Sequence, residues 1–323
     1  MRYPTLLVLA ASLAVCQVSA QSTPGTPPGA GAPAAKPASL QAIIDTELPK
    51  ITGRAGIWVK HLKTGEEAAF HADDQFNAAS VIKIPVAVLA MQMVDEGTLR
   101  LGERITITKD DMRDGSGMFR HHDPGLQPTF RDVVMQMIAT SDNIATDIAI
   151  RKVGGVDRVN AFIAEAGYAP GMRLVQTTGE LDAKYASVSR GAERIAKTNG
   201  DPSFRLGEMT PRAIGRMFAA IEQRTIVSQT AGDDLVRMLL AQQAGARRLP
   251  HYVGLRIGHK TGDIPPVVAN DVGIAYHASG AIVVAFLVNE ITGSYGEAED
   301  QMGRTMQKIA EHYDGRAGAA ARR

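Results

Sequence analysis

A serine and a lysine stand three residues apart in Ala79-Ser80-Val81-Ile82-Lys83, at the start of an apolar stretch. Residues i and i+3 share one face of a helix, so the amine of Lys83 can reach the hydroxyl of Ser80. A serine hydroxyl is a weak nucleophile until a base removes its proton. A lysine placed among apolar neighbours loses its charge readily enough to be that base. The spacing therefore predicts a nucleophile at Ser80 and a base at Lys83.

Two further motifs follow this pair, Ser141-Asp142-Asn143 and Lys260-Thr261-Gly262. We expect Ser80-x-x-Lys83 at the start of a helix, the Ser-Asp-Asn motif in a turn between helices and the Lys-Thr-Gly motif on a strand. In this order, the three motifs resemble the signature of class A β-lactamases and penicillin-binding proteins. The resemblance extends over residues 39–315.

The resemblance implies acyl transfer at three catalytic residues. Ser80 attacks a carbonyl carbon and Lys83 accepts its proton, while Ser141 relays a proton to the departing nitrogen. The family pattern places the oxyanion hole at the backbone N–H groups of Ser80 and of the residue after the Lys-Thr-Gly motif. It also implies a set of substrate-binding residues, which are Asn143, Lys260, Thr261, Gly262 and Asp263. Of these, Asn143 suits a substrate amide, and Lys260 and Thr261 suit a carboxylate.

The sequence departs from the family at the residue that activates water for hydrolysis of the acyl-enzyme. Class A β-lactamases use a glutamate in a long loop to activate water, and Thr178 stands at that position here. Threonine is not a base. Glu180 lies two residues further on and is a second candidate, if the loop has another shape. Leu181-Asp182 matches the Leu-Asn that follows the glutamate, and Asp271 replaces an arginine on the strand after Lys-Thr-Gly.

Three functions remain open on these residues. The first is a class A type β-lactamase, which is acylated at Ser80 and freed by water. The second is a penicillin-binding-protein-like D-Ala-D-Ala peptidase, or another serine amidase or esterase, that turns over β-lactams weakly or not at all. The third is a sensor of β-lactams or cell-wall peptides on the same fold. A Ser-His-Asp triad is disfavoured, because Ser116 in Gly115-Ser116-Gly117 lacks the G-x-S-x-G pattern.

The elements expected around these motifs define an α+β fold. A helix capped by Ser39 precedes a hairpin, and three strands and a final helix close the chain. We expect one antiparallel sheet, built from both chain ends and flanked by helices, beside an all-helical lobe. The predicted strands are Ala55–Leu62, Glu67–Phe70, 254–262, Asp271–His277 and Ala281–Asn289.

Helix signals fill the middle of the sequence. The spacing Thr129-x-x-Asp132 predicts a capping box, and Thr210-Pro211 predicts a helix start. Between them, residues 168–209 are polar and glycine-rich without a strong period, and we expect a functional or mobile loop there.

The N-terminus has the pattern of an export signal. Arg2 precedes an apolar run and Val18-Ser19-Ala20, so we predict a signal peptide over residues 1–20 that is cleaved before Gln21. Lipid anchoring at Cys16 is disfavoured by the bulky Val15. A flexible Pro/Ala/Gly linker over 21–38, a hydrolase domain over 39–315 and a flexible tail over 316–323 complete the predicted organisation. We expect a periplasmic or secreted protein.

Composition narrows the partners. The chain has 323 residues, 45% of them hydrophobic and 21% charged, and removal of Arg2 leaves 34 basic and 34 acidic residues. This balance argues against a nucleic-acid partner. His121-His122-Asp123 lacks a third ligand at usable spacing, so we predict neither a metal nor another cofactor. We expect a monomer with a small-molecule β-lactam or cell-wall peptide substrate and no membrane-spanning segment in the mature chain.

Overall fold

A computed structural model describes residues 38–320, so the predicted signal peptide and almost all of the predicted linker lie outside the described residues. The α-helices are α1 (Leu40–Glu47), α2 (Lys83–Asp95), α3 (Phe130–Ala139), α4 (Asn143–Lys152), α5 (Gly155–Glu165), α6 (Thr178–Ala186), α7 (Ala192–Gly200), α8 (Pro211–Glu222), α9 (Gln229–Leu240) and α10 (Tyr295–Ala320). The strands are β1 (Arg54–His61), β2 (Glu67–Phe70), β3 (Phe76–Asn77), β4 (Met172–Leu174), β5 (Gly207–Met209), β6 (Arg256–Ile264), β7 (Val268–His277) and β8 (Gly280–Asn289). Short 3₁₀ turns are η1 (Leu48–Lys50), η2 (Ala79–Ile82), η3 (Lys109–Asp111), η4 (Phe119–His121) and η5 (Pro202–Phe204).

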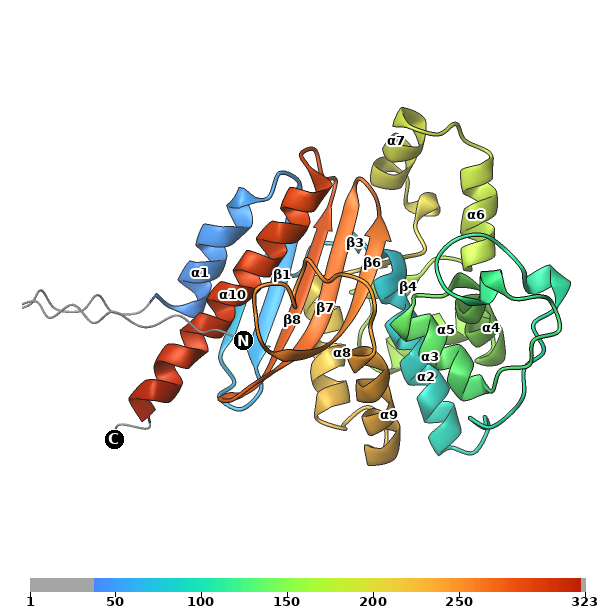
Figure 1. Ribbon diagram of the computed structural model, residues 1–323, viewed down its shortest axis with the longest axis horizontal. Coiled ribbons are helices and arrows are strands. Elements are labelled where there is room, and N and C mark those ends of the chain that lie inside the picture. Colours follow the sequence, from blue (N-terminus) through green and yellow to red (C-terminus); the bar gives the residue numbers. More distant parts are fainter. Residues whose placement is uncertain (1–37, 321–323) are drawn as a thin grey trace, which may run out of the picture. The chain divides into compact units, whose positions relative to one another are not determined.

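The main sheet joins the two ends of the described chain. Its strand order is β2-β1-β8-β7-β6, and each neighbouring pair is antiparallel. The N-terminal strand β1 pairs with the C-terminal strand β8 along its whole length, with Ile57 opposite Phe286. Figure 1 shows this sheet between the α1–α10 pair and the group of helices that contains α2, α3, α4 and α5. The predicted α+β fold is confirmed.

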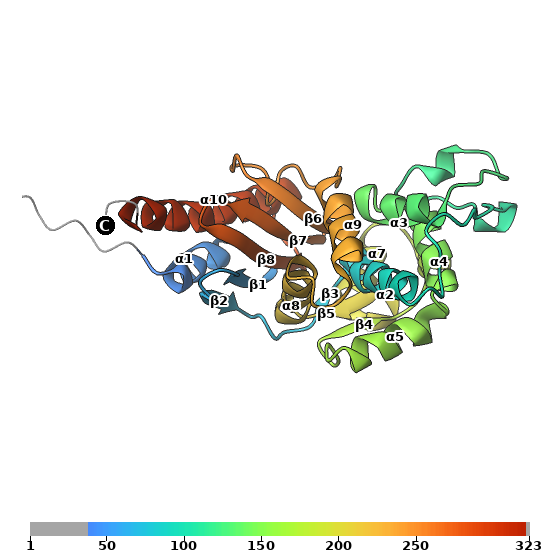
Figure 2. The same cartoon turned by 90° about the horizontal axis from the view of Figure 1, so that it is seen from below.

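Both faces of this sheet are covered. Along β8, Ile282, Val284 and Phe286 belong to the core under α1 and α10, whereas Val283 and Ala285 belong to the core shared with α8. Alternate side chains of a strand point to opposite faces, so a strand covered on both faces needs an uninterrupted apolar run. Figure 2 shows α1 and α10 on one side of the strands and α8 on the other.

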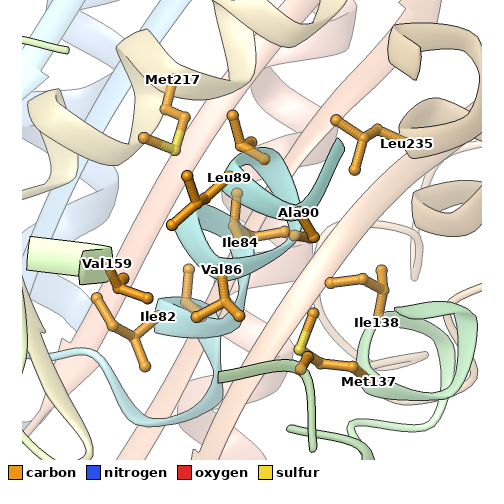
Figure 3. Packing of buried hydrophobic residues seen from close by; sticks show 14 of the residues in the cluster. Ile82, Ile84, Val86, Leu89, Ala90, Met137, Ile138, Val159, Met217 and Leu235 are labelled. Atoms are coloured by element: carbon orange, nitrogen blue, oxygen red, sulfur yellow. The ribbon is translucent and has the colours of Figure 1, made fainter. Parts of the chain in front are cut away.

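The helix α2 forms the centre of the helical lobe. Every residue from Lys83 to Met91 is buried, and α3, α4, α5 and α9 all contact the helix. Figure 3 shows Leu89 and Ala90 of α2 among side chains from the surrounding helices, including Met137 and Leu235. A helix enclosed on all sides has no polar face. Its first turn, which follows Ser80, is therefore held firmly in place.

The expectation of an irregular loop over residues 168–209 is wrong. This segment contains α6 and α7, and its strands β4 and β5 form a small sheet with β3. The signal for α6 was present in the sequence. Thr177 and Glu180 form a reciprocal capping box at the start of the helix.

Other helix starts agree with their sequence signals. The side chains of Ser39 and Thr210 cap α1 and α8, and Thr129 with Asp132 forms the predicted capping box of α3. The last helix, α10, continues to Ala320, beyond the boundary at residue 315 that the sequence predicts. Within residues 38–320, no helix is long and apolar enough to cross a membrane.

Candidate active site

Ser80 lies in the turn η2, directly before α2, and is half-buried. The predicted helix start is thus a 3₁₀ turn at Ser80 and an α-helix from Lys83 onward. The preceding residue, Ala79, has a φ of 43°, in the left-handed region that costs an L-residue on the order of 1–2 kcal/mol. Its backbone N–H donates to Asn77 Oδ1 at 3.1 Å, which helps to hold this conformation. Backbone strain of this kind is concentrated at functional sites.

Lys83 reaches the Ser-Asp-Asn turn. Its Nζ donates to the carbonyl oxygen of Ser141 at 2.6 Å, to Ser141 Oγ at 3.2 Å and to Asn143 Oδ1 at 2.9 Å. Within the described residues, Ser80 Oγ makes no hydrogen bond, so the predicted contact between Lys83 and Ser80 is not formed. Catalytic hydrogen bonds commonly tighten only when substrate is bound.

The amine of Lys83 is fully buried. Burial lowers its pKa well below the usual value, and the nearby charge of Lys260 lowers it further, while the carboxylates of Asp142, Asp147 and Asp182 oppose this shift. A lysine whose charged form is disfavoured in this way is neutral in a larger fraction of molecules. The environment therefore suits a base.

Ser141 connects two amines. Its Oγ accepts from Lys83 Nζ at 3.2 Å and from Lys260 Nζ at 3.1 Å, and its φ of 57° places it in the left-handed region. Burial lowers the pKa of Lys260 to about 8, although the charges of Asp263 and Asp271 counteract this. A hydroxyl between two amines with lowered pKa values can pass a proton between them.

The neighbouring Asp142 anchors this turn. Its Oδ1 accepts from the N–H of Ala145 at 2.8 Å, which caps α4, and its Oδ2 accepts from the N–H of Phe119 at 2.7 Å. This second bond ties the 109–125 loop to the site. The same loop brings in Ser116, whose Oγ donates to the carbonyl oxygen of Ser141 at 2.6 Å. No role at this site was predicted for Ser116.

The strand β6 passes close to η2 because it has a glycine there. A Cβ on Gly262 would lie 2.6 Å from the carbonyl oxygen of Ala78, closer than side-chain carbons come to other atoms. Only glycine allows this approach, which brings the next residue, Asp263, to the pocket that Ser80 lines. Thr261 is fully buried, and its Oγ1 has no hydrogen-bond partner among the described residues.

An arginine reaches this edge of the sheet from an unexpected direction. The guanidinium of Arg248, which is 2% exposed, pairs with Asp263 and with Glu299, and the hydroxyl of Tyr295 donates to Asp263 at 2.9 Å. Asp271 lies opposite Thr261 in the sheet register. Arg248 comes from the connection between α9 and β6, so a comparison along the strand alone misses it.

Ser80 lines a pocket of about 230 Å³. Two of the predicted substrate-binding residues, Asn143 and Asp263, also line it. The buried residues Lys83, Ser141, Lys260, Thr261 and Gly262 do not. The remaining lining residues are Ala79, Ser116, Thr178, Leu181, Asp182, Tyr185, Leu206 and Ile264. A larger cavity of about 620 Å³ near the start of β1 contains none of the predicted site residues, so we place the site at the smaller pocket.

The two candidates for the missing glutamate have different positions. Thr178 lines the pocket, where its N–H donates to Asp147 Oδ1 at 2.7 Å. Glu180 does not line it. Its carboxylate accepts from the backbone N–H of Thr177 at 2.8 Å and from the Thr177 hydroxyl at 2.9 Å, and these bonds lower the pKa of Glu180. Glu180 therefore serves as a helix cap outside the pocket.

Comparisons with known proteins identify the family of this chain. The sequence model that describes the beta-lactamase enzyme family matches residues 38–313. Beta-lactamase L2 of Stenotrophomonas maltophilia is 24% identical over 242 residues, which cover 73% of this chain and 74% of that protein. The crystal structure of a beta-lactamase from Sphaerobacter thermophilus matches with a TM-score of 0.70 and 28% identity over 84% of this chain and 94% of that one. The structure of PBP-A shares the fold, with a TM-score of 0.71 and 24% identity over 85% and 96% of the two chains. Because the family model spans most of the sequence, the chain belongs to the beta-lactamase enzyme family, the group of class A β-lactamases and penicillin-binding-protein-like serine hydrolases.

Proposed function

We propose that the protein is an exported active-site-serine hydrolase of class A β-lactamase type, which is acylated at Ser80 by a β-lactam and freed by water. The observation that carries this proposal is the buried Lys83, whose pKa is lowered by burial and whose Nζ is fixed by Ser141 and Asn143 beside the Ser80 turn. A buried amine held in this position is suited to activate a serine.

In the proposed acylation, Lys83 Nζ takes the proton of Ser80 Oγ, and Oγ attacks the carbonyl carbon of the lactam. The backbone N–H groups of Ser80 and Asp263 stabilise the negative charge on the carbonyl oxygen. The carbon–nitrogen bond then breaks, and the nitrogen takes a proton that passes from Lys83 through Ser141. The hydrogen bonds that join Lys83, Ser141 and Lys260 support this route.

The pocket supports binding of an anionic amide. Asn143 lines it and can bond a substrate amide, and the cationic form of the buried Lys260 favours a carboxylate. The negative charge of Asp263 would oppose such a substrate, but Arg248 neutralises it through their ion pair.

A penicillin-binding-protein-like peptidase, or another amidase or esterase, is the second candidate. It is favoured by Thr178, because no carboxylate stands at the position of the family's glutamate. If the ester on Ser80 persists, the protein can also serve as a sensor of β-lactams or cell-wall peptides.

One experiment separates these functions. The mature chain is incubated with a chromogenic cephalosporin, while colour release and intact mass are recorded over time. Steady turnover supports the β-lactamase. A persistent adduct on Ser80 supports the peptidase or the sensor, and the absence of any adduct would overturn acylation at Ser80 itself.

Replacement of Lys83 tests the base. We expect Lys83→Ala to slow adduct formation by about 10²–10⁴-fold, the usual contribution of a general base. The matched control is Lys63→Ala, which removes an exposed lysine and should leave the rate unchanged. Equal acylation rates in both variants would exclude Lys83 as the base.

Export is tested separately. We propose cleavage before Gln21 and a periplasmic or secreted location, and N-terminal sequencing of the protein recovered from outside the inner membrane checks both. A chain that keeps Met1 and stays in the cytoplasm would contradict this proposal.

A further inference from the structure

One face of α6 forms a wall of the pocket. Its lining residues, Thr178, Leu181, Asp182 and Tyr185, follow the spacing i, i+3, i+4 and i+7, which places them on a single side of the helix. Ser80 lines the same pocket from η2. On the basis of the function proposed above, we propose that Asp182 is the general base that activates the water for hydrolysis of the Ser80 ester.

The other acidic residue that lines the pocket is already paired. Asp263 also lines it, but its carboxylate is held by Arg248 and by the hydroxyl of Tyr295. Glu180 lies off the lining face and caps its own helix. Within residues 38–320, the carboxylate of Asp182 makes no hydrogen bond and no ion pair. Its lone pairs are therefore available to accept a proton from water.

The surroundings of Asp182 strengthen it as a base. The side chain is exposed at the pocket, yet neighbouring protein removes part of its hydration, and this desolvation raises its pKa. The charge of Arg113 lowers the pKa, that of Asp147 raises it, and Arg194 and Asp114 have smaller effects of the same two kinds. The net result is a raised pKa, and a carboxylate of higher pKa binds a proton more tightly. Asp182 also lies close enough to Lys83 to influence the charge of that amine.

The helix that carries Asp182 is fixed to the lobe. Asp147 of α4 accepts from the N–H of Thr178 at 2.7 Å and from that of Gly179 at 2.9 Å, and it also pairs with Arg113. These bonds hold the first turn of α6, and Asp182 follows in the next turn. A base must be positioned by such a support to act on a water near the ester.

Hydrolysis of the ester then proceeds through a tetrahedral adduct. Asp182 takes a proton from water as the water oxygen forms a bond to the ester carbon, and the carbonyl π electrons move to its oxygen. When the tetrahedral adduct collapses, the bond between carbon and Ser80 Oγ breaks with its electron pair left on Oγ. The proton held by Asp182 then returns to Oγ. The products are the hydrolysed acid and the free serine.

The test measures the two half-reactions separately in Asp182→Asn. The full mature chain is mixed with a penicillin, and intact mass follows the growth of the adduct and its decay after the free penicillin is removed. We expect decay slower by about 10²–10⁴-fold, because asparagine cannot accept the proton, and a much smaller change in adduct growth, which reflects only the effect of the Asp182 charge on Lys83. Glu180→Gln is the matched control on the same helix and should decay like the wild type.

A second variant tests whether another carboxylate restores decay of the adduct. Thr178→Glu places a carboxylate at another pocket position, and in the Asp182→Asn background it should speed decay of the adduct again. This rescue would show that the lost function is a base rather than the fold of α6.

Two groups of outcomes overturn the inference. Equal decay rates in Asp182→Asn and the wild type, or an adduct that already persists in the wild type, refute the role of Asp182 while acylation at Ser80 stands. The absence of any adduct in the wild type refutes the proposed function and this inference with it.

Discussion

At the scale of single residues, the charge of Lys260 should set the response of the enzyme to alkaline pH. Its pKa is lowered by burial to about 8, so the cationic form is present below that pH and is lost as the pH rises through it. If this cation attracts the substrate carboxylate, kcat/KM for a carboxylate-bearing β-lactam should be level near neutral pH and fall above about pH 8. A pH–rate profile at low substrate concentration reports this pKa of the free enzyme.

A neutral ester of the same β-lactam is the control for Lys260. It lacks the carboxylate, so its kcat/KM should show no such fall. If kcat/KM falls equally at alkaline pH for both compounds, the fall is due to a group other than Lys260.

Residue types and spacing predicted part of this site. Ser80, Asn143 and Asp263 line one pocket, and Ser141 lies between Lys83 and Lys260, as motifs from distant parts of the sequence suggested. Short motifs fix which residues belong to a turn or a strand edge. The approach of Ser116 could not be predicted, because the irregular 109–125 loop positions it through contacts with Asp142 and Ser141.

At the scale of elements, Asp147 decides whether α6 keeps its place in the pocket wall. Its side chain is 8% exposed, and its carboxylate binds two backbone N–H groups of α6 and the guanidinium of Arg113. In Asp147→Ala these donors lose their partner, and each buried unsatisfied group costs about 1–3 kcal/mol. We expect a lower free energy of unfolding in urea and faster proteolysis within residues 178–209.

Asp147→Asn is the comparison for this element. The amide keeps one acceptor oxygen and loses the charge. The free energy of unfolding of this variant should therefore lie between that of the wild type and that of the alanine variant. Proteolysis of the alanine variant at the wild-type rate would contradict an anchoring role.

Local signals explain which elements were predictable. Caps such as Ser39, Thr129 and Thr210 act within one helical turn, so the sequence reveals them directly. Thr177 gives the same signal for α6, but the residues around it are mostly polar and show no helical period of apolar residues, so the helix was not predicted. The three-residue strands β4 and β5 have no local signal, because they exist only through pairing with distant segments.

At the scale of the whole molecule, the order of elements predicted a sheet assembled from both ends of the chain. Strand signals lie near both ends of the chain and helix signals lie between them, and this order indicates a sheet that both ends share. It does not give the order β2-β1-β8-β7-β6, because a strand covered on both faces is apolar throughout and carries no mark of its neighbours. The sequence also did not indicate how the Ser80 turn is joined to this sheet.

Three buried asparagines make that junction. Asn270 of β7 donates to the carbonyl oxygens of Asn77 and Ala78 at 2.9 and 3.1 Å and accepts from the N–H of Val288 at 3.0 Å, while Asn289 Oδ1 accepts from the N–H of Asn77 at 2.6 Å. The network thus connects two central strands to the residues just before Ser80. Its loss should affect both the sheet and the Ser80 turn.

Asn270→Ala tests this connection between sheet and site. The variant leaves buried backbone groups unpaired, so the free energy of unfolding should fall by on the order of 1–3 kcal/mol. Urea unfolding followed by the fluorescence of Trp58, the single tryptophan, and by circular dichroism should show both transitions at lower urea. Acylation of Ser80 should slow in the folded variant, because its turn loses the support of β7. Gln229→Ala removes an exposed amide and should change neither quantity. If Asn270→Ala behaves like that control, the network does not position Ser80.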